Sequence, residues 1–94
     1  MSSRGTVIKK VVLDVLKPLE PSIIEMASRL ASISHVNNVI ITSVEIDRST
    51  ESVKISIEGD DIDMDKIKTA IEELGAVIHS VDEVTSAKRK KTLT

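Results

Sequence analysis

The alternation of apolar and polar residues along this chain predicts four strands. Residues 7–16 are almost continuously aliphatic, which is typical of a buried strand. Residues 39–47 and 53–58 each alternate apolar with polar side chains, and a polar turn separates them. Residues 76–84 form a fourth apolar segment. The two alternating segments, which are the second and third strands, are therefore predicted to form a hairpin with each other.

Two helices are predicted between these strands. The first follows Pro21 and a capping box formed by Ser22 and Glu25, and the second begins at Asp63 and ends at Gly75. In the first helix, apolar residues recur at helical spacing: Ile23, Ala27, Leu30 and Ala31. The second helix has a stripe of the same kind: Ile67, Ala70, Ile71 and Leu74. Both helices are therefore amphipathic and should cover a sheet.

The order βαββαβ predicts one α+β domain with a ferredoxin-like fold. Right-handed crossovers place both helices on one face of an antiparallel sheet, in which the strand order is 4-1-3-2. A chain of 94 residues has room for one such domain. We expect a flexible N-terminus over residues 1–6, the domain over 7–86 and a basic C-terminal tail over 87–94.

Opposite charges indicate how the strands pair. Pairing the first strand with the third places Lys10 opposite Glu58 and Asp14 opposite Lys54. Pairing the second strand with the third in a similar way places Glu45 opposite Lys54. This second register assigns three side chains to the face that the helices cover: Thr42, Val44 and Ile46.

The same alternation separates buried from exposed positions. We expect a core of aliphatic side chains: Val11, Leu13, Val15, Ile23, Ala27, Leu30, Val44, Ile55, Ile57, Ile67, Ile71 and Leu74. The face of the sheet without helices also receives aliphatic residues: Val12, Leu16, Val39 and Ile41. Because the chain has no third layer to cover them, we expect a second copy of the protein to do so, and the protein to be a homo-oligomer.

Composition excludes several kinds of site. The chain contains no Cys, Phe, Tyr or Trp, and its net charge is −2. This rules out disulfides, thiolate nucleophiles, zinc sites built on cysteine and an aromatic platform for nucleic-acid bases. No N-terminal run resembles a signal peptide, and no apolar stretch approaches the roughly 20 residues that cross a bilayer. We therefore expect a cytoplasmic protein with no membrane partner.

The most acidic segment is a candidate cation site. The carboxylates of Glu58, Asp60, Asp61 and Asp63 are ligands that calcium or magnesium would accept. However, Lys66 stands where an EF-hand loop needs glycine. The alternative interpretation is structural, because carboxylates at this position cap the second helix and favour its dipole.

A second candidate site joins the first and last strands. Asp14 and His79 could meet on the helix-free face, and a histidine paired with a carboxylate can act in acid–base chemistry. The alternation of the last strand is ambiguous, and we assign one set to that face: Val77, His79, Val81 and Glu83. A structural or interface role for His79 is the alternative, since no third catalytic partner is evident.

The tail and the fold suggest other activities that the residues do not support. The run Lys88-Arg89-Lys90-Lys91 could contact phosphates, but it is short, terminal and without aromatic neighbours, which disfavours nucleic-acid binding. The paired cysteines of a heavy-metal-transport domain are absent. So is the arginine that an acylphosphatase would need in the loop of residues 17–20.

Residues 11–18, 20–23, 57–60 and 77–84 together resemble an archaeal family, domain-of-unknown-function family 211. The resemblance implies a ferredoxin-like fold that assembles into homo-oligomers, with rings as one arrangement. It implies no activity.

We therefore hypothesise an oligomeric binding or regulatory module without enzymatic activity, which holds a divalent cation or small ligand between subunits. One alternative is an enzyme whose carboxylates and His79 form a site shared across subunits. Another is a weak nucleic-acid binder that acts through the basic tail.

Overall fold

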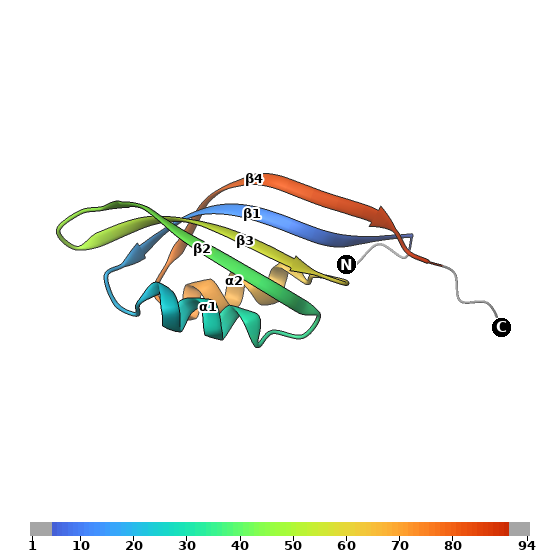
Figure 1. The fold of residues 1–94 in the computed structure, drawn as a ribbon, viewed down its shortest axis with the longest axis horizontal. Helices are drawn as coiled ribbons and strands as arrows, with labels where there is room; N and C mark the ends of the chain where they lie inside the picture. Colours follow the sequence, from blue (N-terminus) through green and yellow to red (C-terminus); the bar gives the residue numbers. More distant parts are fainter. Residues whose placement is uncertain (1–4, 91–94) are drawn as a thin grey trace.

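The computed structural model describes residues 5–90 and confirms the predicted architecture (Figure 1). Its elements are β1 (Thr6–Pro18), α1 (Ile23–Ala31), β2 (Val36–Ile46), β3 (Thr50–Gly59), α2 (Met64–Glu73) and β4 (Val77–Lys88). The four strands form one antiparallel sheet in the order β2-β3-β1-β4, which is the predicted order read from its other edge. Residues 1–4 and 91–94, the outer parts of the two predicted terminal segments, lie outside the described residues.

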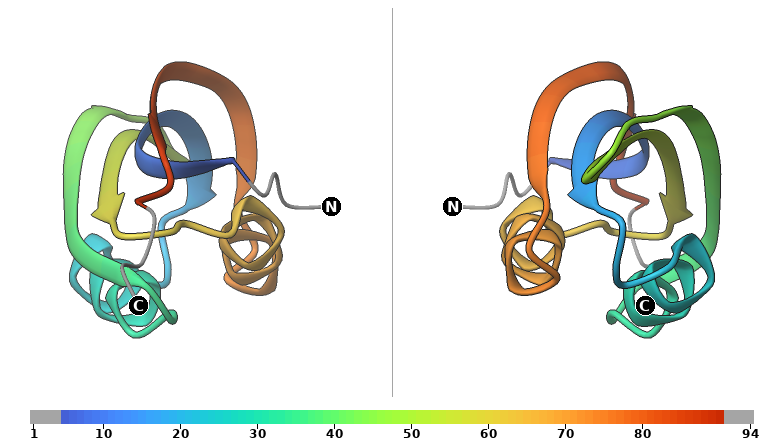
Figure 2. Two further views of the ribbon diagram at one scale, coloured as in Figure 1. Left: turned by 90° about the vertical axis from the view of Figure 1, so that its right-hand side faces the viewer. Right: turned by 90° about the vertical axis from the view of Figure 1, so that its left-hand side faces the viewer.

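The sheet is longer than the helices that cover it. The molecule measures 56 × 22 × 21 Å. The β2–β3 hairpin extends past the helices at one end, and β1 with β4 extends past them at the other (Figure 1). Seen along its length, the sheet arches over the helical layer (Figure 2). The core therefore occupies the middle of the sheet, and each end is an arm of two strands.

The predicted register between β1 and β3 is confirmed. Lys10 lies opposite Glu58 and Asp14 opposite Lys54, and the pairing continues without a bulge to Pro18. Because alternate residues of a strand point to opposite faces, this register puts odd-numbered residues of β1 and β3 under the helices.

The register between β2 and β3 differs from the prediction. Thr42, rather than Glu45, lies opposite Lys54, and Glu45 lies opposite Ser52. The ladder also shifts on each side of this stretch, once near Asn37 and once near Val44. Over residues 38–43 the displacement is an odd number of residues, so it moves these side chains of β2 to the other face.

Four predictions for β2 are therefore wrong. Thr42, which we expected under the helices, lies opposite Lys54 on the helix-free face. Val39 and Ile41 do not lie on the helix-free face, because they pair with Ile57 and Ile55 and pack against the core. Val44, which we expected in the core, is 63 % exposed. The apolar residue that β2 contributes to the helix-free face is Ile40, which is 54 % exposed.

The prediction for β4 was partly correct. Val77 and Glu83 pair with residues of the helix-free face, as expected, whereas Val81 lies opposite the buried Leu13. Register shifts at His79 and Asp82 account for the mixture, since each extra residue reverses the alternation.

The core agrees with the expected one apart from β2 and one face of α1. Its buried aliphatic residues include Val11, Leu13, Val15, Leu30, Val53, Ile55, Ile57, Ile67 and Ile71. In α1 the buried residue that the sequence analysis missed is Met26, whereas Ala31 is exposed. The predicted caps Ser22 and Asp63 both accept hydrogen bonds from backbone N–H groups of their helices.

A buried ion pair joins the ends of the two central strands. The side chain of Lys17 on β1 is 0 % exposed, and its Nζ lies 3.2 Å from Oε1 of Glu51 on β3. The same ammonium donates to the carbonyl oxygens of Pro18 at 2.7 Å and Leu19 at 3.2 Å. All three N–H groups therefore have acceptors, which a lysine needs in order to be buried.

Ser43 and Lys17 both stabilise the negative charge of Glu51. A hydrogen bond from the Ser43 hydroxyl lowers the pKa of Glu51 most, burial raises it, and the Lys17 ammonium lowers it again. The result lies below the ordinary value of 4.5. Because folding lowers this pKa, the carboxylate stabilises the fold above pH 4.5, and the contribution is lost as the pH falls through the folded-state pKa.

We expect Leu13→Ala and Ile55→Ala each to lower the free energy of unfolding by about 2–5 kcal/mol, because each leaves a cavity in a fully buried site. Ile24→Ala is the control, since Ile24 is 77 % exposed on α1, and it should change stability by less than about 0.5 kcal/mol. Urea unfolding, followed by circular dichroism, gives the free energy of unfolding of each variant. Equal losses for Leu13→Ala and Ile24→Ala would contradict the core assignment.

We also expect Ser43→Ala to reduce the loss of stability on acidification, because the Glu51 pKa then moves back toward 4.5. Urea unfolding from about pH 7 to about pH 3 measures the slope, with the exposed Ser28→Ala as control. Superimposable pH profiles for Ser43→Ala and the parent protein would show that this hydrogen bond does not set the Glu51 pKa.

Candidate functional site

Ion pairs cross the face of the sheet that no helix covers, hereafter the open face. Lys10 Nζ lies 3.2 Å from Glu83 Oε2, and Lys54 Nζ lies 3.3 Å from Asp82 Oδ2. A hydrogen bond from the Ser80 hydroxyl, at 2.7 Å, is the main cause that holds the pKa of Asp82 below its ordinary value, and Lys54 adds to it. The lysines of β1 and β3 therefore pair with carboxylates of the edge strand β4.

Asp14 and His79 are near each other in the sheet but are not paired. Asp14 lies opposite Ser80, while His79 falls at the adjacent register shift and is exposed. Within residues 5–90, no hydrogen bond or ion pair joins these two side chains. The acid–base pair that the sequence suggested is therefore not assembled in a single subunit.

Two of the four candidate metal ligands bond to asparagines of β2. Asn38 Nδ2 donates to Glu58 Oε1 and Asn37 Nδ2 donates to Asp60 Oδ1, each at 3.3 Å. These carboxylates therefore hold β2 against the end of β3.

The other two candidate ligands have different partners. Asp61 Oδ2 lies 3.4 Å from Arg89 Nη2, which ties the end of β4 to the loop before α2. Asp63 accepts the backbone N–H groups of Asp65 and Lys66 as the α2 cap. Within residues 5–90, no group of three or more His, Cys, Asp or Glu side chains is placed to hold a metal ion, so a calcium or magnesium site between subunits stays a prediction.

The predicted basic tail is partly engaged in the fold. Lys88 belongs to β4, and the backbone N–H of Arg89 donates to the carbonyl oxygen of Gly5 at 2.9 Å. Because its side chain also pairs with Asp61, Arg89 makes its contacts within the subunit. Lys91 lies outside the described residues.

The aliphatic residues of the open face form a mixed surface. Val12 is half-buried, Leu16 is 44 % exposed, and Val77, which pairs with Leu16, is 63 % exposed. Ile40 takes the place expected for Val39 and Ile41. Val12 and Leu16 therefore lie on the open face as expected, and their role in an interface stays a prediction.

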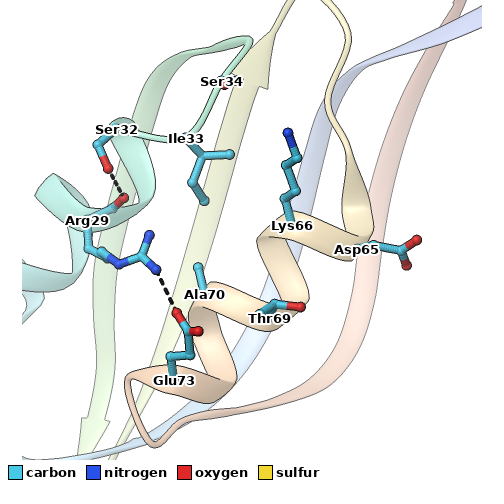
Figure 3. A pocket seen from close by; sticks show the side chains of 9 residues that line it. All are labelled: Arg29, Ser32, Ile33, Ser34, Asp65, Lys66, Thr69, Ala70 and Glu73. Carbon is cyan, nitrogen blue, oxygen red and sulfur yellow. Dashed lines mark hydrogen bonds and ion pairs between the residues drawn. The ribbon is translucent and has the colours of Figure 1, made fainter.

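A groove between the two helices was not predicted from the sequence. It has a volume of about 480 Å³, and Arg29 of α1 and Lys66 of α2 contribute to its lining (Figure 3). Each of these residues alone resembles an ordinary solvent-exposed charge opposite an apolar stripe. Only the packing of α1 beside α2 brings them to the same groove, and no motif in the sequence indicates it.

A second groove, of about 820 Å³, lies where β1 and β4 pass the start of α2. Apolar residues such as Ile8, Ile62 and Val84 line it together with His35 and Asp61.

Among the helices of residues 5–90, none is long and apolar enough to cross a membrane.

Comparisons with known proteins agree with the resemblance noted in the sequence. The model of the DUF211 family, described as "Uncharacterized ArCR", matches residues 9–91. The protein named "Uncharacterized protein MJ0319" from Methanocaldococcus jannaschii is 51 % identical over 82 residues, which cover 87 % of this chain and 84 % of that relative. The chain therefore belongs to the DUF211 family, which is described as uncharacterized, and it has a relative in an archaeon.

Proposed function

We propose that this protein is a self-associating binding module without enzymatic activity, in which copies join through the edge strand β2. One side of β2 pairs with β3, and no strand among residues 5–90 lies along its other side. An unpaired edge presents backbone N–H and C=O groups that a strand of another copy can satisfy.

The composition of β2 is the observation that carries this proposal. Its middle, residues 39–44, contains neither a charged residue nor a proline. Proteins usually protect a free edge with such residues. Three large aliphatic side chains of β2 are also more than half exposed: Ile40, Val44 and Ile46. Pairing with another copy would satisfy the backbone and cover part of this surface at once.

The other free edge, β4, carries more of this protection than β2, whose register with β3 shifts at two points. Asp82, Glu83 and Lys88 place charges along β4, and its register with β1 shifts at three points. Charges and bulges both discourage the addition of a strand. This contrast favours β2 as the surface through which self-association begins.

Small ligands are expected along the seam between copies. Asn38 and Glu58 lie on the open face beside Ile40, so polar and apolar groups already adjoin the β2 edge. The enzymatic alternative has less support, because the carboxylates it requires each bond to separate partners. Nucleic-acid binding through the tail has less support as well, since Arg89 is paired with Asp61.

Sedimentation velocity at low micromolar concentration tests the proposal. The chain mass is 10.2 kDa, so we expect the parent protein to sediment as a larger species. Ile40→Lys should shift the population toward the monomer, because a charge on an edge strand opposes strand addition. The matched control is Ile24→Lys, which adds the same charge at a 77 % exposed helical position and should sediment as the parent does.

Two outcomes would contradict the proposal in different ways. A single species of 10.2 kDa for the parent protein would refute self-association. An assembly that Ile40→Lys leaves unchanged would show that copies join through a surface other than the β2 edge.

A further inference from the structure

The groove between α1 and α2 gathers groups that bind anions. Arg29 and Lys66 approach it from the two helices, and hydroxyl groups lie around it: Ser32, Ser34 and Thr69 (Figure 3). Its apolar lining comes from Ile33 and Ala70. Its volume of about 480 Å³ falls within the range of small-molecule sites, roughly 300–1,000 Å³.

The lining of this groove carries two cations, Arg29 and Lys66, and two carboxylates, Asp65 and Glu73. Arg29 Nη2 lies 2.7 Å from Glu73 Oε1, so one cation has a counter-ion within the subunit. The Lys66 ammonium has no hydrogen bond or ion pair with any residue of the part that the structure describes. The Asp65 side chain is directed away from Lys66 (Figure 3). Lys66 is therefore the cation of this lining that has no counter-ion in contact among residues 5–90.

The donor geometry suits a phosphate group. A guanidinium presents several N–H groups in a plane, which matches phosphate oxygens, and an ammonium adds a point charge. Arg29 uses Nη2 toward Glu73, and a more highly charged oxyanion can compete with that carboxylate because the pair is exposed, with side-chain exposures of 43 % and 60 %. The hydroxyl groups of Ser34 and Thr69 can donate to the remaining oxygens, whereas the Ser32 hydroxyl already donates to the Arg29 carbonyl oxygen at 2.7 Å.

We propose that this groove binds a small phosphorylated molecule. The phosphate lies between Arg29 and Lys66, Glu73 acts as the internal counter-ion that it displaces, and Ile33 and Ala70 contact the rest of the ligand. The site is built by α1, the segment of residues 32–34 that follows it, and α2 of one subunit. It does not include β2, so it does not depend on self-association.

Amide NMR during titration with inorganic phosphate, at constant ionic strength, tests this site. Saturable shifts are expected at Ser34, Lys66 and Thr69. Lys66→Gln and Arg29→Gln should each weaken the apparent affinity by about tenfold, the loss expected for one charge-assisted hydrogen bond. Lys68→Gln is the matched control, because Lys68 is exposed on α2 and does not line the groove, so its affinity should equal that of the parent.

Substitution of the counter-ion gives a test of opposite sign. Glu73→Gln should tighten phosphate binding, because it removes the competing carboxylate, whereas Glu72→Gln makes the same charge change outside the groove and should not. Shifts that do not saturate, or equal losses for Lys66→Gln and Lys68→Gln, would overturn the site. Saturable binding of succinate without binding of phosphate would overturn the assignment to phosphate.

Discussion

The uninterrupted pairing of β1 with β3 is the constraint on which the rest of the structure depends. It runs from Lys10 and Glu58 to Pro18 and Thr50 without a bulge. This ladder decides which side chains point toward the helices and which remain on the open face. The outer strands β2 and β4 then join it with register shifts that change their own faces locally.

The central part of the fold could be predicted because two kinds of evidence agreed there. Charge pairs and the alternation of Val53, Ile55 and Ile57 both required the same register for β1 and β3. In β2 both alternating sets are aliphatic, so hydrophobicity could not choose between Ile40 and Ile41 for the core. The predicted register of β2 therefore depends on a single charged residue, Glu45, and the bulges near Asn37 and Val44 have no local sequence signal.

The candidate sites were harder to predict because they depend on partners distant in the chain. Lys17 follows an aliphatic strand and looked like part of a polar loop, yet Glu51 and two carbonyl oxygens allow it to be buried. Carboxylates that are close in sequence behave in the opposite way. Asp61 and Asp63 are near neighbours, but one pairs with Arg89 and the other caps α2, so proximity in sequence did not produce a shared site.

Together these features describe a small domain in which the buried polar side chains of residues 5–90 have hydrogen-bond partners, whereas no strand of this part pairs with the outer edge of β2. The buried ion pair and the core need nothing further, whereas β2 leaves backbone groups and aliphatic side chains for another chain to cover. The groove between α1 and α2, where the Lys66 ammonium has no partner among residues 5–90, does not include β2. Assembly through the sheet and binding at the helices can therefore be separate properties of one domain.

Hydrogen exchange at β2 tests the central claim most directly. Every second residue of an edge strand directs its N–H away from the sheet, where it exchanges quickly unless another strand accepts it. For residues 39–44, self-association through this edge predicts slow exchange at all positions at high protein concentration, and fast exchange at alternate positions after dilution. Fast exchange at alternate positions at every concentration would contradict the account.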